Sequence, residues 1–213
     1  MNKINQKTWK RKKHFAFFKK FDYPQFSICA NVDFTKCLKF IKSKDLSVFK
    51  CILFSVMKSA NGIEEFRYRI RGKEIIKHDK INAGITILRE DELYSNSIVK
   101  YSDDVRKFFN NTQKAINKGK RKIIVNEEQK GKDNLVYITC IPWISFTSVM
   151  HPIKLDASDS IPRISWGKFF HENNHVKLPV SVQANHCLVD GIQAAKFYEQ
   201  LQNIFDSPLK HFL

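Results

Sequence analysis

The stretch Gln183-Ala184-Asn185-His186-Cys187-Leu188-Val189-Asp190-Gly191 joins a predicted strand to a predicted helix. Before it, the alternating residues Lys177 to Val182 are typical of a strand. After it, Ile192 to Phe205 has the apolar spacing of an amphipathic helix. A side chain at the end of a strand can be held rigidly while a ligand still reaches it. The stretch is therefore the first place to look for a reactive group.

Three residues of this stretch have chemistry that suits a reactive turn. Neutral histidine has an ordinary pKa of about 6.5, so His186 can accept a proton at neutral pH. The carboxylate of Asp190 can accept hydrogen bonds or pair with a cation, and so fix the turn. We expect Gly191 to supply a backbone angle that other residues resist.

The composition is that of a folded protein with an excess of positive charge. A chain of 213 residues suffices for one domain or two small ones, and 43% hydrophobic with 27% charged residues indicates a globular chain. Lys and Arg number 37 against 21 Asp and Glu, which gives a formal net charge of +16. Such a charge favours anionic partners, namely nucleic acid, acidic lipid or a phosphorylated cofactor. It is equally consistent with a general richness in lysine.

The cysteines and the N-terminus bear on cellular location. The five cysteines are odd in number and lack C-x-x-C spacing, which argues against a disulfide framework or a zinc site and for a reducing compartment. Residues 1–13 are polar and basic, so no signal peptide is predicted. No stretch is long and apolar enough to span a bilayer. We expect a cytoplasmic protein without a metal site and without a membrane partner.

The hydrophobic pattern predicts an α+β fold. Expected strands are residues 26–32, 85–88, 93–99, 135–141 and 144–148, with hairpins around Arg71-Gly72-Lys73-Glu74 and between 163–170 and 175–182. Expected helices are 35–44, 48–60, 103–118 and 192–205, the second of them apolar on nearly every face. These elements predict a two-layer sandwich of a mixed, mostly antiparallel β-sheet covered by helices, as a single domain over 1–213.

Two basic segments have alternative interpretations. Residues 9–18 interleave aromatic and cationic side chains, which can indicate nucleic-acid binding. We interpret them as a short helix that packs Trp9, Phe15 and Phe18 inward. Residues 118–133 are charged and contain glycine, so we expect an exposed connection whose basic run, 118–122, is a solvated surface.

Five stretches stand out in order along the chain: Trp9-x-Arg11-x-x-His14-Phe15, Glu65-Phe66-Arg67, Pro142-Trp143-x-Ser145-Phe146-Thr147-Ser148, Pro162-x-x-Ser165-x-Gly167-Lys168-Phe169 and Asn185-His186-x-x-x-Asp190-Gly191. Together they resemble motifs of the chloramphenicol acetyltransferase family. The last resembles the His-x-x-x-Asp-Gly signature that this family shares with the dihydrolipoamide acyltransferases. Five ordered motifs spread over nearly the whole chain are far more specific than one.

The resemblance implies a fold, a reaction and a set of partners. It implies a homotrimer with three active sites at subunit interfaces. Acetyl-CoA would be a co-substrate rather than a permanently bound cofactor, and its acetyl group would pass to a small hydroxylated acceptor. That acceptor would be chloramphenicol by default, with antibiotic resistance as the consequence. A base that removes the hydroxyl proton makes an alcohol nucleophilic, so the chemistry of His186 agrees with this reaction.

The resemblance also assigns roles to individual residues. The catalytic set is His186 as the base, Thr139 as the hydroxyl that stabilises the oxyanion, and the Arg11–Asp190 pair that holds the histidine loop. The cofactor-binding set is Trp143, Lys168 and Phe169, which match the CoA channel, and Ser165, which matches a threonine thought to hold a water near the intermediate. The acceptor-binding set is Phe17, Phe18, Tyr94 and His151.

The departures from the family pattern cluster on the acceptor side. Asn185 replaces the first of two adjacent family histidines, and Phe18 replaces a tyrosine that contacts chloramphenicol. His151 falls near a leucine position of the antibiotic pocket, where a buried imidazole needs a polar partner. A different hydroxylated acceptor is therefore the main alternative.

Other classes remain as alternatives. The dihydrolipoamide acyltransferase reading is weaker, because the chain contains neither a lipoyl domain nor its linker. The net charge of +16 suggests a nucleic-acid-binding protein, but no recognition motif accompanies it, so no nucleic-acid partner is expected. A relative that binds CoA without catalysis is also compatible with the sequence.

Overall fold

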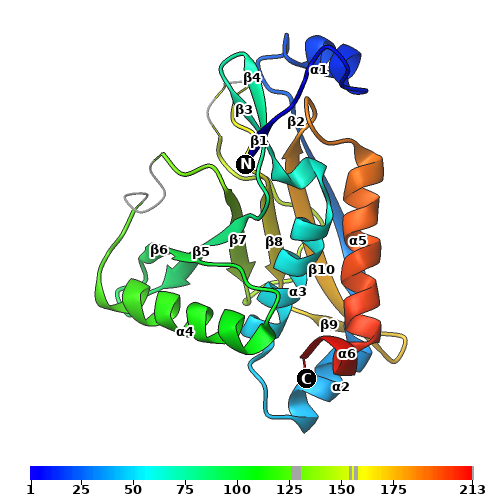
Figure 1. The fold of residues 1–213 in the computed structure, drawn as a ribbon. Coiled ribbons are helices and arrows are strands. Elements are labelled where there is room, and N and C mark those ends of the chain that lie inside the picture. The colour runs from blue at the N-terminus through cyan, green and yellow to red at the C-terminus, as the bar shows by residue number, and fades with distance from the viewer. Residues whose placement is uncertain (126–130, 154, 156–157, 213) are drawn as a thin grey trace.

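A seven-stranded mixed β-sheet forms the centre of the molecule (Figure 1). This computed structural model describes residues 1–125, 131–153, 155 and 158–212. The strand order is β2-β10-β8-β7-β5-β6, and β9 pairs with β10. The strands are β2 (Gln25–Asp33), β5 (Asn82–Leu88), β6 (Tyr94–Val99), β7 (Leu135–Ile141), β8 (Arg163–Gly167), β9 (Phe170–Glu172) and β10 (His175–Asn185). The β5–β7 and β7–β8 pairs are parallel and the others antiparallel, so the predicted mixed α+β sandwich is confirmed.

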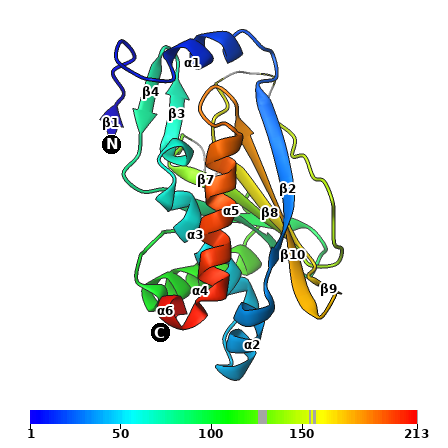
Figure 2. The same ribbon diagram turned by 90° about the vertical axis from the view of Figure 1, so that its right-hand side faces the viewer.

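Helices cover one face of the sheet (Figure 2). They are α2 (Thr35–Ser43), α3 (Val48–Gly62), α4 (Val105–Arg121), α5 (Gly191–Asp206) and the short α6 (Pro208–Phe212). Helix α3 is buried on nearly every side, as its sequence predicts, and it packs against α5. Because side chains alternate along a strand, Ile164, Trp166, Val180 and Val182 face this helical layer and are buried.

A smaller three-stranded sheet and an N-terminal helix stand beside the main sheet. The strands are β1 (Asn2–Lys3), β3 (Tyr68–Arg71) and β4 (Glu74–Lys77), preceded by the 3₁₀ helix η1 (Glu65–Arg67). The predicted hairpin is confirmed, and Gly72 at its turn has the positive φ of 59° that glycine adopts easily. Helix α1 (Lys12–Phe18) buries Phe15, while Trp9 and Phe18 are partly buried.

The long strand β10 pairs with three other strands. Its hairpin with β9 turns at Asn173 and Asn174, both at positive φ, as a two-residue turn of this hand requires. The predicted continuous strand 163–170 is interrupted at residues 168 and 169. Here three residues on the β8–β9 side oppose two on β10, which is a β-bulge. Strand β10 ends at Asn185, so His186 begins the following loop.

The chain after β7 runs over part of the second face of the sheet, opposite the helices. The predicted strand 144–148 is wrong, because this segment lies across the sheet face instead of joining a ladder. Ser27 Oγ donates to the carbonyl oxygen of Val149, and Lys168 N donates to that of Ile144. A Cβ on Gly167 would meet the Ile144 carbonyl oxygen at 2.8 Å, so this glycine permits the close approach. An apolar run looks the same in sequence whether it joins a sheet or packs on one.

The predicted connection 118–133 begins later than expected. Helix α4 continues to Arg121, so most of the basic run 118–122 lies on its last turn, where cations suit the helix C-terminus. Its lysines are exposed, as predicted. Residues 126–130 of the connection, and residues 154, 156 and 157 of the predicted loop 151–161, lie outside the described residues.

Candidate active site

The loop after β10 is held by one arginine from α1's N-terminus. Arg11 donates to both carboxylate oxygens of Asp190, to the carbonyl oxygen of His186 at 2.7 Å, and to that of Cys187 at 3.0 Å. His186 N in turn donates to the carbonyl oxygen of Pro24 at 2.7 Å. The predicted Arg11–Asp190 pair is therefore present, and the guanidinium also binds the backbone around the histidine.

Asp190 has a second structural role at the start of α5. Its side chain accepts from the N3 backbone while Gln193 accepts from the Asp190 backbone N–H, which forms a capping box. Hydrogen bonds from Arg11 hold the pKa of the Asp190 carboxyl below its ordinary value. The expectation for Gly191 is wrong: it is the first helical residue, its φ is not positive, and a Cβ there would meet nothing within 4 Å.

Aromatic rings fix the His186 imidazole. The Phe18 ring stacks on it with a centroid distance of 4.0 Å and an interplanar angle of 10°, and Phe26 lies 4.8 Å away. Nδ1 lies 2.9 Å from Asp190 Oδ1, but this contact lacks hydrogen-bond geometry and Nδ1 has no other partner among the described residues. Packing, rather than a hydrogen-bonded carboxylate, therefore orients this ring.

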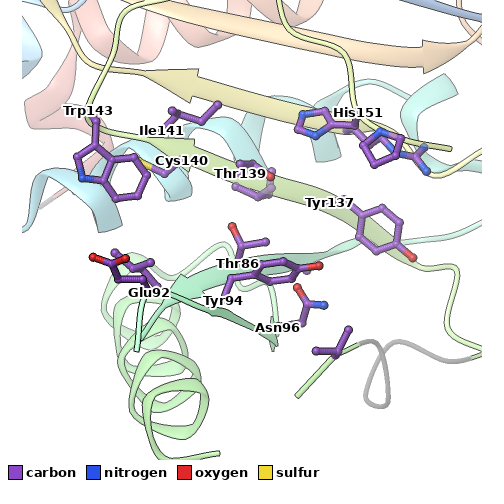
Figure 3. Close-up of a pocket in the computed structure, with 16 residues that line it drawn as sticks. Thr86, Glu92, Tyr94, Asn96, Tyr137, Thr139, Cys140, Ile141, Trp143 and His151 are labelled. Carbon is purple, nitrogen blue, oxygen red and sulfur yellow. The ribbon is translucent and has the colours of Figure 1, made fainter. Parts of the chain in front are cut away.

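A large cavity lies on the face of the sheet opposite the helices, away from His186. Its volume is about 750 Å³, and β5, β6, β7 and the segment after β7 line it. Figure 3 shows Thr86, Tyr94 and Asn96 across from Tyr137 and Thr139, with His151 at one side. Tyr94 and Trp143 are 54% and 63% exposed in the single chain, so this cavity is open.

His151 and Ser165 form a hydrogen-bonded pair at the edge of this cavity. Nε2 and Oγ lie 2.6 Å apart, and Ser165 is only 1% exposed beneath the ring. Gln183 clamps the His151 backbone, with its Oε1 accepting from His151 N at 2.8 Å. Burial, and then the charge of Arg163, lower the pKa of His151, which favours the neutral imidazole. The imidazole thus has the polar partner that its position requires.

A smaller, mostly apolar cavity lies on the other side of β7. Its volume is about 240 Å³, and Phe49, Trp166, Lys168 and Phe169 are among its lining residues. Cys140 borders both cavities, and burial raises the pKa of its thiol to about 11. The expected CoA-channel residues therefore divide between two adjacent cavities, since Trp143 lines only the larger one.

One chain does not bring all the predicted site residues together. Thr139 is paired with Ser165, and Ser165 with Ser181, while His186 follows Ser181 by five positions. Strand spacings of about 4.8 Å and a rise of about 3.3 Å per residue put Thr139 and His186 roughly 15–20 Å apart. Phe17 and Phe18 lie with His186, whereas Tyr94 and His151 lie with Thr139. In one chain the predicted site residues thus form two separate groups, one around His186 and one around Thr139.

Sequence reasoning missed several residues of these two groups. Phe26, which packs on the imidazole, was assigned only to a strand, and Gln183, which holds His151, was given no role of its own. Thr86, Asn96 and Tyr137 line the large cavity without any motif. Their alternation with apolar residues along β5, β6 and β7 is the only sequence signal, and it indicates a face without indicating a cavity.

Two searches of the described residues bear on cofactor and membrane roles. No group of three or more His, Cys, Asp or Glu side chains in this part of the chain could hold a metal ion. Within the same residues, none of the helices has the length and apolar character needed to cross a membrane.

Sequence comparison identifies the family of this chain. The family profile described as "Chloramphenicol acetyltransferase" matches residues 1–202. Chloramphenicol acetyltransferase 3 of Escherichia coli is 26% identical over 209 residues, covering 98% of both chains. A chloramphenicol acetyltransferase of Staphylococcus intermedius is 28% identical over 205 residues, covering 95% of both. These matches define an acyltransferase, and the chain belongs to the chloramphenicol acetyltransferase family.

Solved structures share the fold. A chloramphenicol acetyltransferase superposes with a TM-score of 0.89 at 24% identity, covering 96% of this chain and all of the other. The dihydrolipoamide acetyltransferase of Azotobacter vinelandii superposes with a TM-score of 0.72 at 14% identity, covering 94% and 88%. The fold of this chain is therefore also that of these two acetyltransferases.

Proposed function

We propose that this protein transfers acetyl groups from acetyl-CoA to a hydroxyl of a small acceptor, with His186 as the general base. The observation that carries the proposal is the His186 loop, in which Arg11 binds the carbonyl oxygens of His186 and Cys187 and Phe18 stacks on the imidazole ring. The relatives named chloramphenicol acetyltransferase make chloramphenicol the reference acceptor.

The proposed reaction is a direct transfer. His186 takes the proton of the acceptor hydroxyl as its oxygen bonds to the thioester carbonyl carbon. Thr139 donates a hydrogen bond to the oxyanion that forms on the former carbonyl oxygen. The carbon–sulfur bond then breaks, and the proton passes from His186 to the CoA sulfur. The products are the acetyl ester and free CoA, so atoms and charge balance without another reactant.

The proposed active site needs two copies of the chain. Because Thr139 and His186 of one chain are roughly 15–20 Å apart, a base and an oxyanion donor that act on one carbon must come from neighbouring copies. The open cavity around Thr139 would receive the His186 edge of the next copy. A closed ring of such head-to-tail contacts is a cyclic oligomer, and we propose the homotrimer.

Mixed oligomers test the reaction and the shared site together. His186→Ala and Thr139→Val should each lose most CoA release in a thiol-release assay with acetyl-CoA and chloramphenicol. Co-refolded in equal amounts, the two variants should regain about a quarter of wild-type activity, because one interface in four then pairs two intact halves. Activity of the mixture no greater than that of the separate variants would contradict a shared site. Unchanged activity of His186→Ala alone would contradict the base.

A second acceptor class is favoured by His151. Its imidazole introduces a polar group into the cavity beside Thr139, where it is bonded to Ser165. This chemistry supports an acceptor that is more polar than chloramphenicol.

A further inference from the structure

A row of polar side chains crosses the face of the sheet opposite the helices. The pairing of β6 with β5 puts Asn96 opposite Thr86, and the pairing of β7 with β8 puts Thr139 beside Ser165. The parallel β5–β7 register, continued by one residue beyond Ile85 and Ile138, joins the two pairs. Directly paired residues share a face, so the row Asn96–Thr86–Thr139–Ser165 presents an amide and three hydroxyls on one line.

The cavity exposes most of this row to a ligand. Asn96, Thr86 and Thr139 line it, and the His151 ring covers Ser165 at its end. Tyr94 and Tyr137 add two phenolic hydroxyls. Among the described residues, the side chains of Thr86, Tyr94, Asn96, Tyr137 and Thr139 make no hydrogen bond, so their donors and acceptors remain for a ligand.

The charges of the cavity argue against an anionic acceptor. Arg163 is its one cationic lining residue in the described part of the chain, and Asp159 already binds that guanidinium at 2.7 and 3.2 Å. The Arg163 guanidinium also lies 5.5 Å from the centroid of the Tyr137 ring. His151 is favoured in its neutral form, and Glu92 at the rim would repel an anion.

We propose that the preferred acceptor is an uncharged, polyhydroxylated ring compound, a sugar or glycoside, whose hydroxyls lie along the Asn96–Thr86–Thr139 row. This inference rests on the acetyltransferase function proposed above. Neighbouring strands are about 4.8 Å apart, which is close to the separation of alternate equatorial hydroxyls on a six-membered sugar ring. The half-exposed Tyr94 ring offers an apolar surface to the C–H groups of such a ring.

The selectivity follows from the cost of unpaired polar groups. An aryl group laid on the row removes water from its hydroxyls and amide without replacing the hydrogen bonds, whereas a polyol replaces them. A site built to bond a hydroxyl rejects an analogue that lacks it more strongly than an apolar pocket rejects an extra hydroxyl. His151, at the end of the row, also favours a polyol over an aryl group and is therefore a specificity-determining residue.

Matched acceptors test the inference by CoA release and mass spectrometry of the product. The probes are methyl β-D-glucopyranoside, methyl β-D-galactopyranoside, chloramphenicol, and cyclohexylmethanol as a six-membered ring with one hydroxyl. We expect kcat/KM for at least one glycoside to exceed that for chloramphenicol about tenfold and that for cyclohexylmethanol at least about a hundredfold.

Two near-isosteric variants test the row itself. Asn96→Leu and Thr86→Val should each lower the glycoside-to-chloramphenicol ratio of kcat/KM by about fivefold to tenfold. Asn117→Ala on the exposed side of α4 is the control and should leave the ratio unchanged. The inference is overturned if neither glycoside is acetylated. It is also overturned if Asn96→Leu and Thr86→Val leave the glycoside-to-chloramphenicol ratio of kcat/KM unchanged. If the enzyme then acetylates chloramphenicol and His186→Ala abolishes this activity, the acetyltransferase proposal still holds.

Discussion

Replacing Arg11 should show whether this side chain positions the loop that carries His186 or only stabilises the fold. The change Arg11→Met keeps much of the side-chain volume and removes four hydrogen bonds, two to Asp190 and two to backbone carbonyls. The Asp190 carboxylate keeps the capping-box bond from the N3 backbone and the 2.9 Å contact with His186 Nδ1. The loop that carries His186 then loses these contacts with the N-terminus of α1.

The expected size of the effect follows from these contacts. A hydrogen bond to a charged group contributes about 1.5–3 kcal/mol, but bonds of one side chain are not additive. The side chains of Arg11 and Asp190 are 11% and 30% exposed, so water screens the pair in part. We expect the free energy of unfolding to fall by about 2–4 kcal/mol, a decrease in Tm of roughly 5–12 °C. A small displacement of the base should lower kcat about 10- to 100-fold.

The Arg71–Asp133 pair provides a matched control. Arg71 also makes two hydrogen bonds to one carboxylate, at 2.6 and 2.7 Å, but its side chain is 44% exposed and lies far along the chain from the base. Arg71→Met should cost less than about 1 kcal/mol and leave kcat unchanged. Urea denaturation at fixed protomer concentration and CoA release measure the two quantities.

The pH dependence of the stability lost in Arg11→Met gives a further test. Arg11 lowers the Asp190 pKa, so the stability it contributes is present above the ordinary carboxyl pKa and is lost as the pH falls through the lowered value. The difference between wild type and Arg11→Met should therefore shrink in acid. Equal kcat in wild type and Arg11→Met, or equal losses in the Arg11 and Arg71 variants, would refute the positioning role.

Three further predictions concern catalysis, acid stability and thiol reactivity. Thr139→Val should lower kcat about 10²- to 10³-fold without lowering Tm, because its hydroxyl makes no hydrogen bond within the described residues. Burial alone would raise the pKa of Asp33, but hydrogen bonds led by those from Thr35 lower it to about 2. Asp33→Asn should thus destabilise the protein at pH 6 and progressively less as the pH falls from about 4 toward 2. Burial raises the thiol pKa of both Cys140 and Cys187 to about 11, so these thiols should react with a disulfide reagent at pH 8 far more slowly than in urea.

Each of these three predictions has an outcome that would contradict it. A Thr139→Val enzyme with wild-type kcat would remove the oxyanion role from this hydroxyl. An Asp33→Asn deficit that stays constant down to pH 2 would mean that the carboxylate contributes through packing instead of charge. Rapid native labelling at Cys187 would indicate that the loop around His186 opens in solution.

Local patterns in the sequence sufficed for most of the elements and for one half of the candidate site. Helix α3 has apolar residues on nearly every face and is buried, and the alternation along β10 places its side chains as expected. The reactive loop was predictable because its parts are close in sequence: a strand end, His186, and an aspartate that caps the next helix. Even there, the expected strain at Gly191 is absent, since Asp190 in extended geometry already starts the helix without it.

The other half of the site depended on pairings between distant segments. Asn96, Thr86, Thr139 and Ser165 form a row only because β6, β5, β7 and β8 are neighbours in a particular register, which no local pattern encodes. The same register puts Thr139 and His186 far apart in one chain, although both were assigned to one site. His151 meets Ser165 only because residues 144–153 cross the sheet instead of joining it. Side-chain periodicity fixes which face a residue occupies, whereas tertiary pairing decides which residues share that face.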